Sequence, residues 1–364
     1  MLTRDASVLI VYKNFAAGQN VSHIGLGVAA MNNQKVLRSL GLKVDVLPIV
    51  SGADLAKALQ RTPRTHVIIS APWIPTNDLA LLVLEYSDTY FAVNCHSNVG
   101  FLQADPQGVK LFREGINLAI GTHNFHVAGN SKRFTDWVHE CFGADCAYLP
   151  NCYYLDSHTQ MEHCWHQQPG VPLRIGVFGA PRPLKNMVSA AAAALQMSRE
   201  LRRPLELWIS AGRIETGTPT ILKAINELLA GLPGVSLKFN GWNNWPDFRR
   251  LIAQMHLLLQ PSYTESFNMV TADGIAMGVP SVVSDAIDWV PKNWIAHGDE
   301  VTDIAEAAMR VLHDRHAVRD GYEHLVRHDV TGARSWGREL GLTDLPPYTE
   351  ALNPPGFHRF ESAS

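Results

Sequence analysis

Residues 260–285 read QPSYTESFNMVTADGIAMGVPSVVSD, and this stretch decides the fold class of the 364-residue chain. The short run 256–259 stops at Pro261-Ser262, as a buried strand does where it reaches a turn. From Asn268 onward, apolar side chains recur at helical spacing until Gly278-Val279-Pro280 ends the helix and begins another apolar run. The order strand, helix, strand predicts one unit of a parallel α/β sheet.

Two carboxylates lie on this predicted unit. Glu265 precedes the helix, and Asp273 follows eight positions later, about two helical turns along, so that both can face one groove. A helix that starts at the carboxyl end of a buried strand presents free N–H groups and the positive end of its dipole to an anion. We therefore expect an anion such as a diphosphate to bind at this helix start.

The alternation of short apolar runs and helical segments continues through the chain. Most of the runs are unbroken Val, Ile, Leu and Phe, as strands buried on both faces of a parallel sheet require. Strands are expected at 7–12, 43–48, 66–70, 91–95, 117–122 and 146–149, and again at 174–178, 205–210, 235–239, 256–259 and 280–283. Helical spacing marks 28–40, 134–142, the Ala-rich segment after Lys185, and 268–277.

A polar segment at 156–172, rich in His and Gln, separates the two series of strands and is interpreted as a linker. The sequence thus predicts two doubly wound, Rossmann-like domains, 1–170 and 171–335, followed by a tail at 336–364. In such a pair a ligand binds in the crevice between the domains, at the carboxyl ends of the strands. Periplasmic-type binding proteins and sugar-nucleotide epimerases share this outline, so motifs must decide the function.

Composition narrows the class of protein. The chain is 46% hydrophobic and 18% charged, which is typical of a soluble globular protein. A net charge of −3 without a basic block disfavours a dedicated nucleic-acid binder, although an enzyme could still hold DNA through a local patch. Five cysteines without metal-site spacing predict reduced thiols and a cytoplasmic protein. The first apolar run is too short for a signal peptide or a transmembrane segment.

The quoted stretch resembles the E-x7-E signature of family 4 and related retaining glycosyltransferases of the GT-B type. It agrees with the usual pattern at Pro261, Ser262, Glu265, Phe267, Ala276, Met277, Gly278, Pro280, Val282 and Val283. It departs from the pattern where Ser266 and Asn268 replace glycines and Asp273 replaces the second glutamate. The resemblance implies that Glu265 contacts the donor sugar and that Asp273 accepts hydrogen bonds from the ribose. It also places Ser266, Phe267 and Asn268 beside the donor.

A second segment, RIGVFGAPRPLKN at 174–186, is similar to the family's G-R-L…K-N segment. The similarity implies that Lys185 and Arg182 grip the donor diphosphate and that the backbone at Gly179 approaches it. Ala180 stands where the family arginine usually follows the glycine, so Arg182 is displaced. Two cations opposite a helix start would stabilise a departing diphosphate without a metal ion.

Three further loops contribute candidate residues. The segment NCHSN follows the strand at 91–95, and the family often places a histidine there against the donor sugar, which implies that role for His96. The segment SHIGLG weakly resembles the family's Gly-rich loop, with Gly25 and Gly27. In FNGWNNW, Gly241 permits close approach and Trp242 could stack on the base, although packing between helices explains that tryptophan equally well.

The resemblance as a whole implies a retaining, metal-independent enzyme that moves a hexose-type sugar from a nucleotide-diphosphate sugar to an acceptor hydroxyl. UDP or GDP would be the nucleotide, no other cofactor is implied, and 1–170 would form the acceptor side. Ser335-Trp336 resembles the family's S-W helix, after which the chain crosses back to the first domain. Two alternatives stay open: another GT-B enzyme, either an epimerase or a phosphorylase, and a non-catalytic nucleotide-sugar-binding scaffold. The acceptor could be a small metabolite, a glycan, a lipid headgroup or a modified DNA base.

Overall fold

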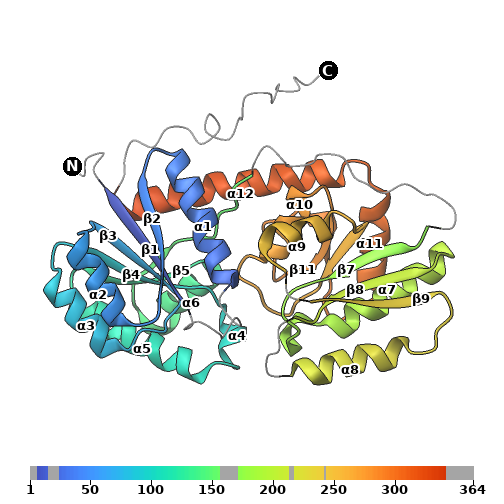
Figure 1. Cartoon of the computed structure of the whole chain (residues 1–364), viewed down its shortest axis with the longest axis horizontal. Helices are drawn as coiled ribbons and strands as arrows, with labels where there is room; N and C mark the ends of the chain where they lie inside the picture. Colours follow the sequence, from blue (N-terminus) through green and yellow to red (C-terminus); the bar gives the residue numbers. More distant parts are fainter. Residues whose placement is uncertain (1–5, 15–23, 156–170, 213–216, 242, 342–364) are drawn as a thin grey trace, which may run out of the picture.

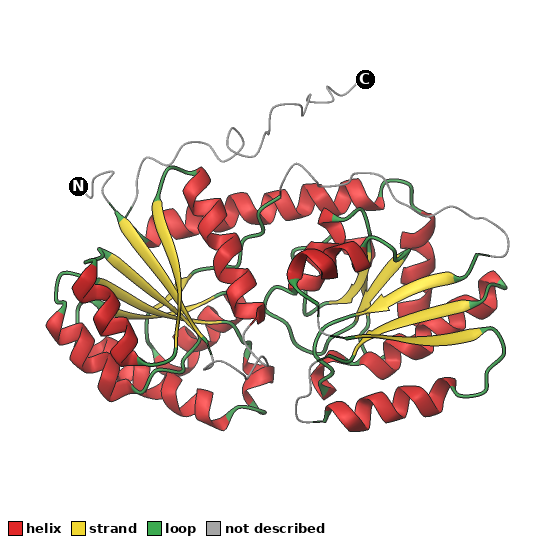
Figure 2. Cartoon of the chain, in the orientation of Figure 1, coloured by secondary structure: helices red, strands yellow, loops and turns green. Residues whose placement is uncertain are grey.

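The computed structural model describes residues 6–14, 24–155, 171–212, 217–241 and 243–341. They form two α/β domains, each built on a six-stranded parallel sheet covered by helices (Figures 1 and 2). The strand orders are β2-β1-β3-β4-β5-β6 in the first domain and β12-β11-β10-β7-β8-β9 in the second. The predicted class, a GT-B arrangement of two doubly wound domains, is confirmed.

The first domain contains the strands β1 (Ser7–Lys13), β2 (Lys43–Ile49), β3 (His66–Ser70), β4 (Tyr90–Cys95), β5 (Phe125–Gly129) and β6 (Cys146–Tyr148). Its helices are α1 (Ile24–Ser39), α2 (Gly52–Arg61), α3 (Thr76–Glu85), α4 (Val99–Leu102), α5 (Pro106–Gly121) and α6 (Lys132–Phe142). Along β1, Val8 and Ile10 join one apolar cluster while Leu9 and Val11 join another, because the sheet is buried on both faces.

The second domain contains the strands β7 (Leu173–Val177), β8 (Leu205–Ser210), β9 (Val235–Asn240), β10 (Leu257–Gln260), β11 (Ser281–Ser284) and β12 (Ile295–Ala296). Its helices are η1 (Pro183–Lys185), α7 (Met187–Leu201), α8 (Thr218–Leu229), α9 (Trp245–Ile252), α10 (Met269–Ala276), η2 (Lys292–Trp294), α11 (Val301–His313) and α12 (Ala317–Glu339). The Ala-rich face of α7 lies buried against this sheet, since small side chains let the helix approach closely.

The prediction of a strand at 117–122 was wrong. These residues end helix α5, and the strand in that position is β5, which the sequence reading missed. The apolar run belongs to an amphipathic helix that starts after Asp105, whose side chain accepts a hydrogen bond from Gly108 N at 2.9 Å. Phe112 and Ile116 continue its buried face at helical spacing. A short apolar run alone could not distinguish the two structures.

The long helix α12 joins the two domains (Figure 1). It packs on α10 of the second domain and reaches β6 of the first, where Ala333 and Trp336 enter an apolar cluster of the first domain. Ser335-Trp336 thus lies where the chain has returned to the first domain. No helix in the described part of the chain is both long and apolar enough to cross a bilayer.

An extended segment after β6 leads from the first domain toward the second. Its backbone groups are paired with side chains of α1 and α12, which replace the sheet partners that an isolated strand lacks. The pairs are Ser335 Oγ to Tyr148 O at 2.8 Å, Trp336 Nε1 to Pro150 O at 2.8 Å, Cys152 N to Asn33 Oδ1 at 2.7 Å, Tyr153 N to Asp329 Oδ1 at 2.8 Å, and Tyr154 N to Asn32 Oδ1 at 2.9 Å.

Candidate active site

The candidate residues lie in loops at the carboxyl ends of the strands, where the two domains meet. Glu265 follows β10, Lys185 ends η1 after β7, and His96 follows β4. The carboxyl ends of neighbouring parallel strands share one edge of a sheet, so the topology brings side chains far apart in sequence together.

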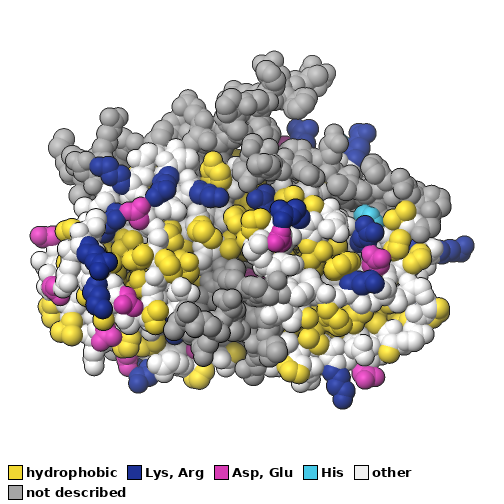
Figure 3. All heavy atoms as spheres, in the orientation of Figure 1, with side chains coloured by type: hydrophobic (Ala, Val, Ile, Leu, Met, Phe, Trp, Pro, Cys, Tyr) yellow, Lys and Arg dark blue, Asp and Glu magenta, His cyan; other side chains and the backbone are white. Residues whose placement is uncertain are grey.

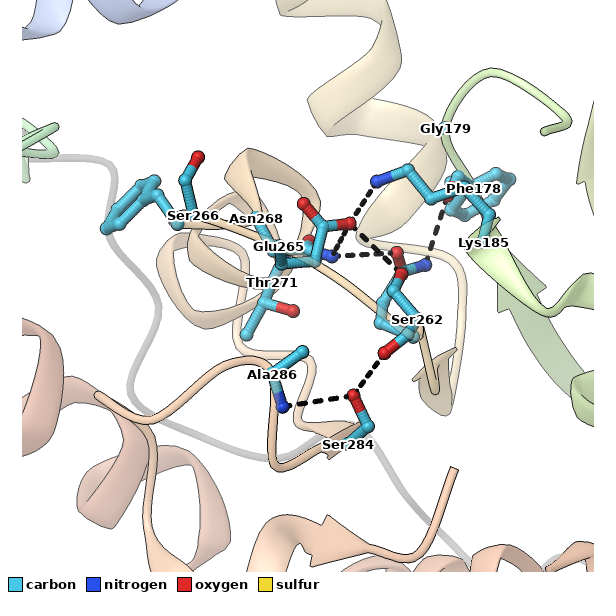
Figure 4. Close-up of polar contacts among 12 residues, drawn as sticks. Phe178, Gly179, Lys185, Ser262, Glu265, Ser266, Asn268, Thr271, Ser284 and Ala286 are labelled. Atoms are coloured by element: carbon cyan, nitrogen blue, oxygen red, sulfur yellow. Dashed lines mark hydrogen bonds and ion pairs between the residues drawn. The ribbon is translucent and has the colours of Figure 1, made fainter. Parts of the chain in front are cut away.

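Glu265 is held by donors on one side of its carboxylate. Its Oε1 accepts hydrogen bonds from Ser262 Oγ at 3.0 Å and from Asn268 Nδ2 at 3.2 Å, and forms an ion pair with Lys185 Nζ (Figure 4). The side chains of Lys185 and Glu265 are 19% and 12% exposed, so water weakens this pair little. Saturating Oε1 with donors fixes the direction of the other oxygen, Oε2.

Asn268 explains one departure from the family pattern. Its φ of 66° is left-handed, a conformation in which asparagine is the usual substitute for glycine. Its side chain also accepts a hydrogen bond from Thr271 N at 3.0 Å and so caps α10. Asparagine therefore keeps the backbone bend of the motif glycine and adds a donor for Glu265.

Lys185 connects the two parts of the site. A Cβ at Gly179, whose φ is 109°, would stand 3.9 Å from Lys185 Nζ, so the ammonium group lies next to the glycine backbone. Arg182 extends toward the first domain, with its guanidinium 5.0 Å from the ring centre of Phe101 on α4. Arg182, Lys185, Glu265 and His96 all line one cavity of about 70 Å³ between the domains.

Ser266 accounts for the other glycine that the motif lacks. Its hydroxyl donates to the backbone oxygen of His96 at 2.8 Å and accepts from Asn130 Nδ2 at 3.1 Å, and both partners belong to the first domain. Asn98 Nδ2 donates to the backbone oxygen of Glu265. These contacts, which we call the interdomain clasp, join the motif loop to the loops after β4 and β5.

His96 presents a neutral imidazole to the cavity. Burial lowers the pKa of His96 to about 4, so the ring is uncharged near neutral pH. Its Nε2 is buried and has no hydrogen-bond partner among the described residues. A buried ring nitrogen without a protein partner is available to a ligand that enters the cavity.

A second cavity, of about 200 Å³, lies between α10 of the second domain and the start of α1 of the first. Gly25, Gly179, Gly241 and Asp273 line it together with Met269 and Val270, whose N–H groups belong to the first turn of α10. First-turn N–H groups have no partner within a helix, so this wall offers donors and a positive dipole end. Trp242 lies outside the described residues.

Asp273 lines this cavity but is already hydrogen-bonded. Its Oδ1 accepts from Tyr153 Oη at 2.7 Å and from Trp245 Nε1 at 2.8 Å. Burial raises the pKa of Asp273 to about 6, although these two hydrogen bonds oppose the shift. The shorter side chain of aspartate is thus tied to the crossing segment through Tyr153 and to the start of α9 through Trp245.

Phe267 and Gly27, both predicted to lie beside the donor, line neither cavity. Phe267 is buried and stacks on Trp289 with ring centres 5.1 Å apart, and a Cβ at Gly27 would lie 3.1 Å from the ring of Tyr12. Both positions therefore serve packing in this structure.

The sequence reading did not single out the roles of Asn98, Asn130 and Tyr153. Asn98 and Asn130 follow the ends of β4 and β5, and that position was the available signal. Tyr153 lies in the crossing segment and has no local signal. No group of three or more His, Cys, Asp or Glu side chains within the described residues is placed to hold a metal ion.

Residues 173–314 match the model of the family "Glycosyl transferases group 1". No curated protein matched the sequence.

Solved structures resemble the whole chain in fold. Sucrose-phosphate synthase from Thermosynechococcus elongatus aligns with a TM-score of 0.66 at 13% identity, over 92% of this chain and 98% of that one. A UDP-forming trehalose-phosphate synthase from Burkholderia xenovorans, in complex with glucose-6-phosphate, gives 0.64 at 14% identity over 92% and 100%. Anabaena HepE in complex with UDP gives 0.62 at 14% identity over 92% and 99%.

The fold is of the GT-B type, the fold shared by the glycosyltransferases to which this chain is structurally similar. More particularly, its second domain matches the glycosyl transferases group 1 model over residues 173–314, from the start of β7 to the end of α11.

Proposed function

We propose that the chain is a retaining, metal-independent glycosyltransferase that transfers a hexose-type sugar from a nucleoside-diphosphate sugar to an acceptor hydroxyl. The observation that carries the proposal is the convergence of Lys185, Glu265 and His96 on one interdomain cavity, next to a second cavity lined by Gly179 and Asp273. The first cavity supplies charge and hydrogen-bonding groups at a reacting centre, and the second offers a glycine backbone and the first turn of α10 to the phosphates of a nucleotide.

The known structures support the choice of nucleotide. The trehalose-phosphate synthase is UDP-forming by its description, and HepE was solved with UDP. We therefore propose UDP as the first choice and GDP, the other nucleotide common in the family, as the second.

The diphosphate would lie between Gly179 and the first turn of α10, within reach of Lys185. Positive charge held there before the reaction stabilises the charge that develops on the leaving diphosphate, and needs no reorganisation as the bond breaks. This preorganised charge is the reason for proposing metal independence. Arg182, on the rim of the smaller cavity, adds a second cation beside Lys185.

The sugar would lie between Glu265 and His96. Glu265 Oε2 faces it as a hydrogen-bond acceptor, and neutral His96 offers Nε2. The acceptor oxygen forms a bond to C1 on the face that the leaving phosphate departs, and the acceptor proton passes to a phosphate oxygen. Retention of configuration in this scheme rests on the family resemblance of residues 260–285. The ribose hydroxyls would donate to Asp273.

The test is a thermal-shift panel of UDP, GDP, ADP and TDP and their common sugar conjugates, with and without EDTA. A ligand at about 100 times its Kd adds roughly 2.7 kcal/mol of stability, which is a clear shift. We expect one nucleotide to raise Tm, with EDTA making no difference and Lys185→Ala removing the shift. Lys223→Ala, an exposed position on α8, is the control.

The chemistry needs its own readout. The anomeric configuration of the product, followed by NMR from the start of the reaction, should match that of the donor. Inversion would disprove the retaining mechanism, and activity lost to EDTA and restored by a divalent cation would disprove metal independence. Turnover that requires free phosphate, or donor conversion without an acceptor, would indicate the phosphorylase or epimerase. No shift with any nucleotide would favour the non-catalytic scaffold.

A further inference from the structure

A large cavity of the first domain adjoins the proposed reaction centre. It measures about 890 Å³, near the upper end of the roughly 300–1,000 Å³ typical of ligand sites. His96 and Ser97 line this cavity and also the small cavity that contains Lys185 and Glu265. A molecule held in the larger cavity can therefore present a hydroxyl at the place where the donor sugar would lie.

Trp73 forms a fixed apolar wall of this cavity. Its Nε1 donates to Ser70 O at 3.1 Å, and the preceding loop turns back at Ala71, whose φ is 72° and whose N–H donates to Asn94 O at 2.8 Å. Lys13 Nζ lies 5.9 Å from the indole centre. An indole locked by its own hydrogen bond offers a flat surface with little entropy to lose, which suits the C–H face of a sugar ring.

The cavity is lined by equal numbers of cationic and anionic side chains. Two lysines, Lys13 and Lys110, and two acids, Asp105 and Glu114, line it, and no arginine does so in the described part of the chain. Glu114 accepts from Thr76 Oγ1 at 2.7 Å and lies 3.9 Å from Lys110 Nζ. A phosphate monoester requires a surplus of converging positive charge, most often from arginine, and this lining does not provide it.

The edge of the cavity carries polar side chains that can pair with hydroxyl groups. Asn77, Gln107 and Asn117 are exposed at its edge, and Ser97 lies next to His96. Amide side chains both donate and accept, as sugar hydroxyls do, so they pair with them in either direction. On the face drawn in Figure 3, Lys and Arg side chains are dispersed among acidic and apolar ones, and form no continuous cationic surface for a nucleic acid.

We propose that the acceptor is a neutral carbohydrate, either an unphosphorylated sugar or a glycoside, whose ring packs on Trp73. One of its hydroxyls points toward His96, while Glu114 and the amide rim bind the others. This inference rests on the proposed glycosyl transfer and specifies the substrate class of the same site.

The experiment is an acceptor screen with the full chain and whichever donor shifts Tm, measuring release of the nucleoside diphosphate and the labelled product. The panel pairs neutral sugars with their phosphates: glucose with glucose-6-phosphate, and maltose and methyl glucoside beside them. Phenyl alcohols and duplex DNA containing hydroxymethylated pyrimidines complete it. We expect the neutral sugars to give kcat/KM at least tenfold above that of the phosphates, with no transfer to the alcohols or the DNA.

Variants test the two features separately. Trp73→Leu should raise KM for a neutral sugar by tenfold or more, with the Kd of the nucleotide unchanged, and Trp73→Phe should restore much of the loss. Glu114→Gln keeps an acceptor for Thr76 but removes a negative charge. It should improve kcat/KM for the phosphorylated sugar, relative to the neutral one, by about tenfold, equivalent to 1.4 kcal/mol. Glu140→Gln, exposed on α6 outside the cavity, is the matched control.

The outcomes separate this inference from the proposed function. Preferential use of sugar phosphates, or transfer only to alcohols or only to DNA, overturns the neutral-sugar acceptor while the transferase stands. An unchanged KM in Trp73→Leu overturns the role of the indole. A chain that binds no nucleotide fails at the earlier step, and then both proposals fall.

Discussion

Replacing Lys185 by alanine tests the reading of the site most directly. The change removes the ammonium group that pairs with Glu265 and that lies next to the backbone of Gly179. Losing one preorganised group that stabilises charge costs about 2.7–4 kcal/mol in the transition state, or roughly 10² to 10³ in kcat. We expect Lys185→Ala to fall in this range.

The same change affects folding less than catalysis. Leaving one partner of a buried pair without compensation costs about 3–5 kcal/mol. Glu265, however, keeps the hydrogen bonds from Ser262 and Asn268, and its side chain is 12% exposed. The loss should therefore approach the roughly 1.5–3 kcal/mol of one hydrogen bond to a charged group.

Three measurements decide the outcome. Denaturant unfolding gives the stability loss, initial rates at saturating donor give kcat, and calorimetry compares binding of UDP with binding of uridine. Lys185→Ala should weaken UDP binding by about tenfold to a hundredfold and leave uridine binding unchanged, since only the diphosphate meets the lysine. A folded variant with kcat within about threefold of the parent would refute the placement of Lys185 at the diphosphate. Equal losses for uridine and UDP would refute it too.

Three further changes test other parts of the structure. Burial raises the pKa of Asp273 to about 6, so lowering the pH from 7 to 5 should protonate this carboxylate and weaken UDP binding by about tenfold. Asp273→Asn should bind UDP weakly at both pH values. The pKa of Asp273 is higher in the folded chain than in the unfolded one, so the contribution of this group to stability declines as the pH rises from about 4 to 6. If the free energy of unfolding of the parent, minus that of Asp273→Asn, rose over this range, the assignment would be contradicted. Ser266→Ala removes two hydrogen bonds of the interdomain clasp, and should give a larger radius of gyration by X-ray scattering and about tenfold weaker donor binding; unchanged values would show that the clasp does not hold the domains together. In Gly332→Ala the new Cβ would lie 2.9 Å from Cys152 Sγ, so stability should fall by about 1–3 kcal/mol, while Gly121→Ala, with open space around it, should have almost no effect on Tm.

The α/β fold class could be predicted because it depends on local patterns, whereas the candidate site residues came from the resemblance of residues 174–186 and 260–285 to a known family. Unbroken apolar runs indicated parallel strands. The turn between β10 and α10 carries Glu265 close to Asn268, which caps α10. Lys185 was named because residues 174–186 resemble a family segment, and the structure places it in a glycine-containing turn after β7, paired with Glu265.

Contacts between distant segments were not predictable from one sequence. The bonds from Ser266 to His96 and Asn130 join residues more than a hundred positions apart, and no local pattern reports such a pairing. For the same reason, the sequence implied only that Asp273 contacts the ribose. It did not indicate that Tyr153 and Trp245 donate hydrogen bonds to this carboxylate. Helix α5 was mistaken for a strand because its amphipathic pattern becomes visible only when the run is extended back to Asp105.

The return of α12 to the first domain has a consequence for how the chain is made. Ala333, Trp336 and Leu340 belong to the same apolar cluster as Val8 and Ile10 of β1. During synthesis, domains generally fold from the N-terminus onward as they emerge. Here the first domain to leave the ribosome cannot complete its core until almost the last described residue has been added. The first domain therefore stays incompletely packed until the second domain has been synthesised, and the two domains complete their folding together.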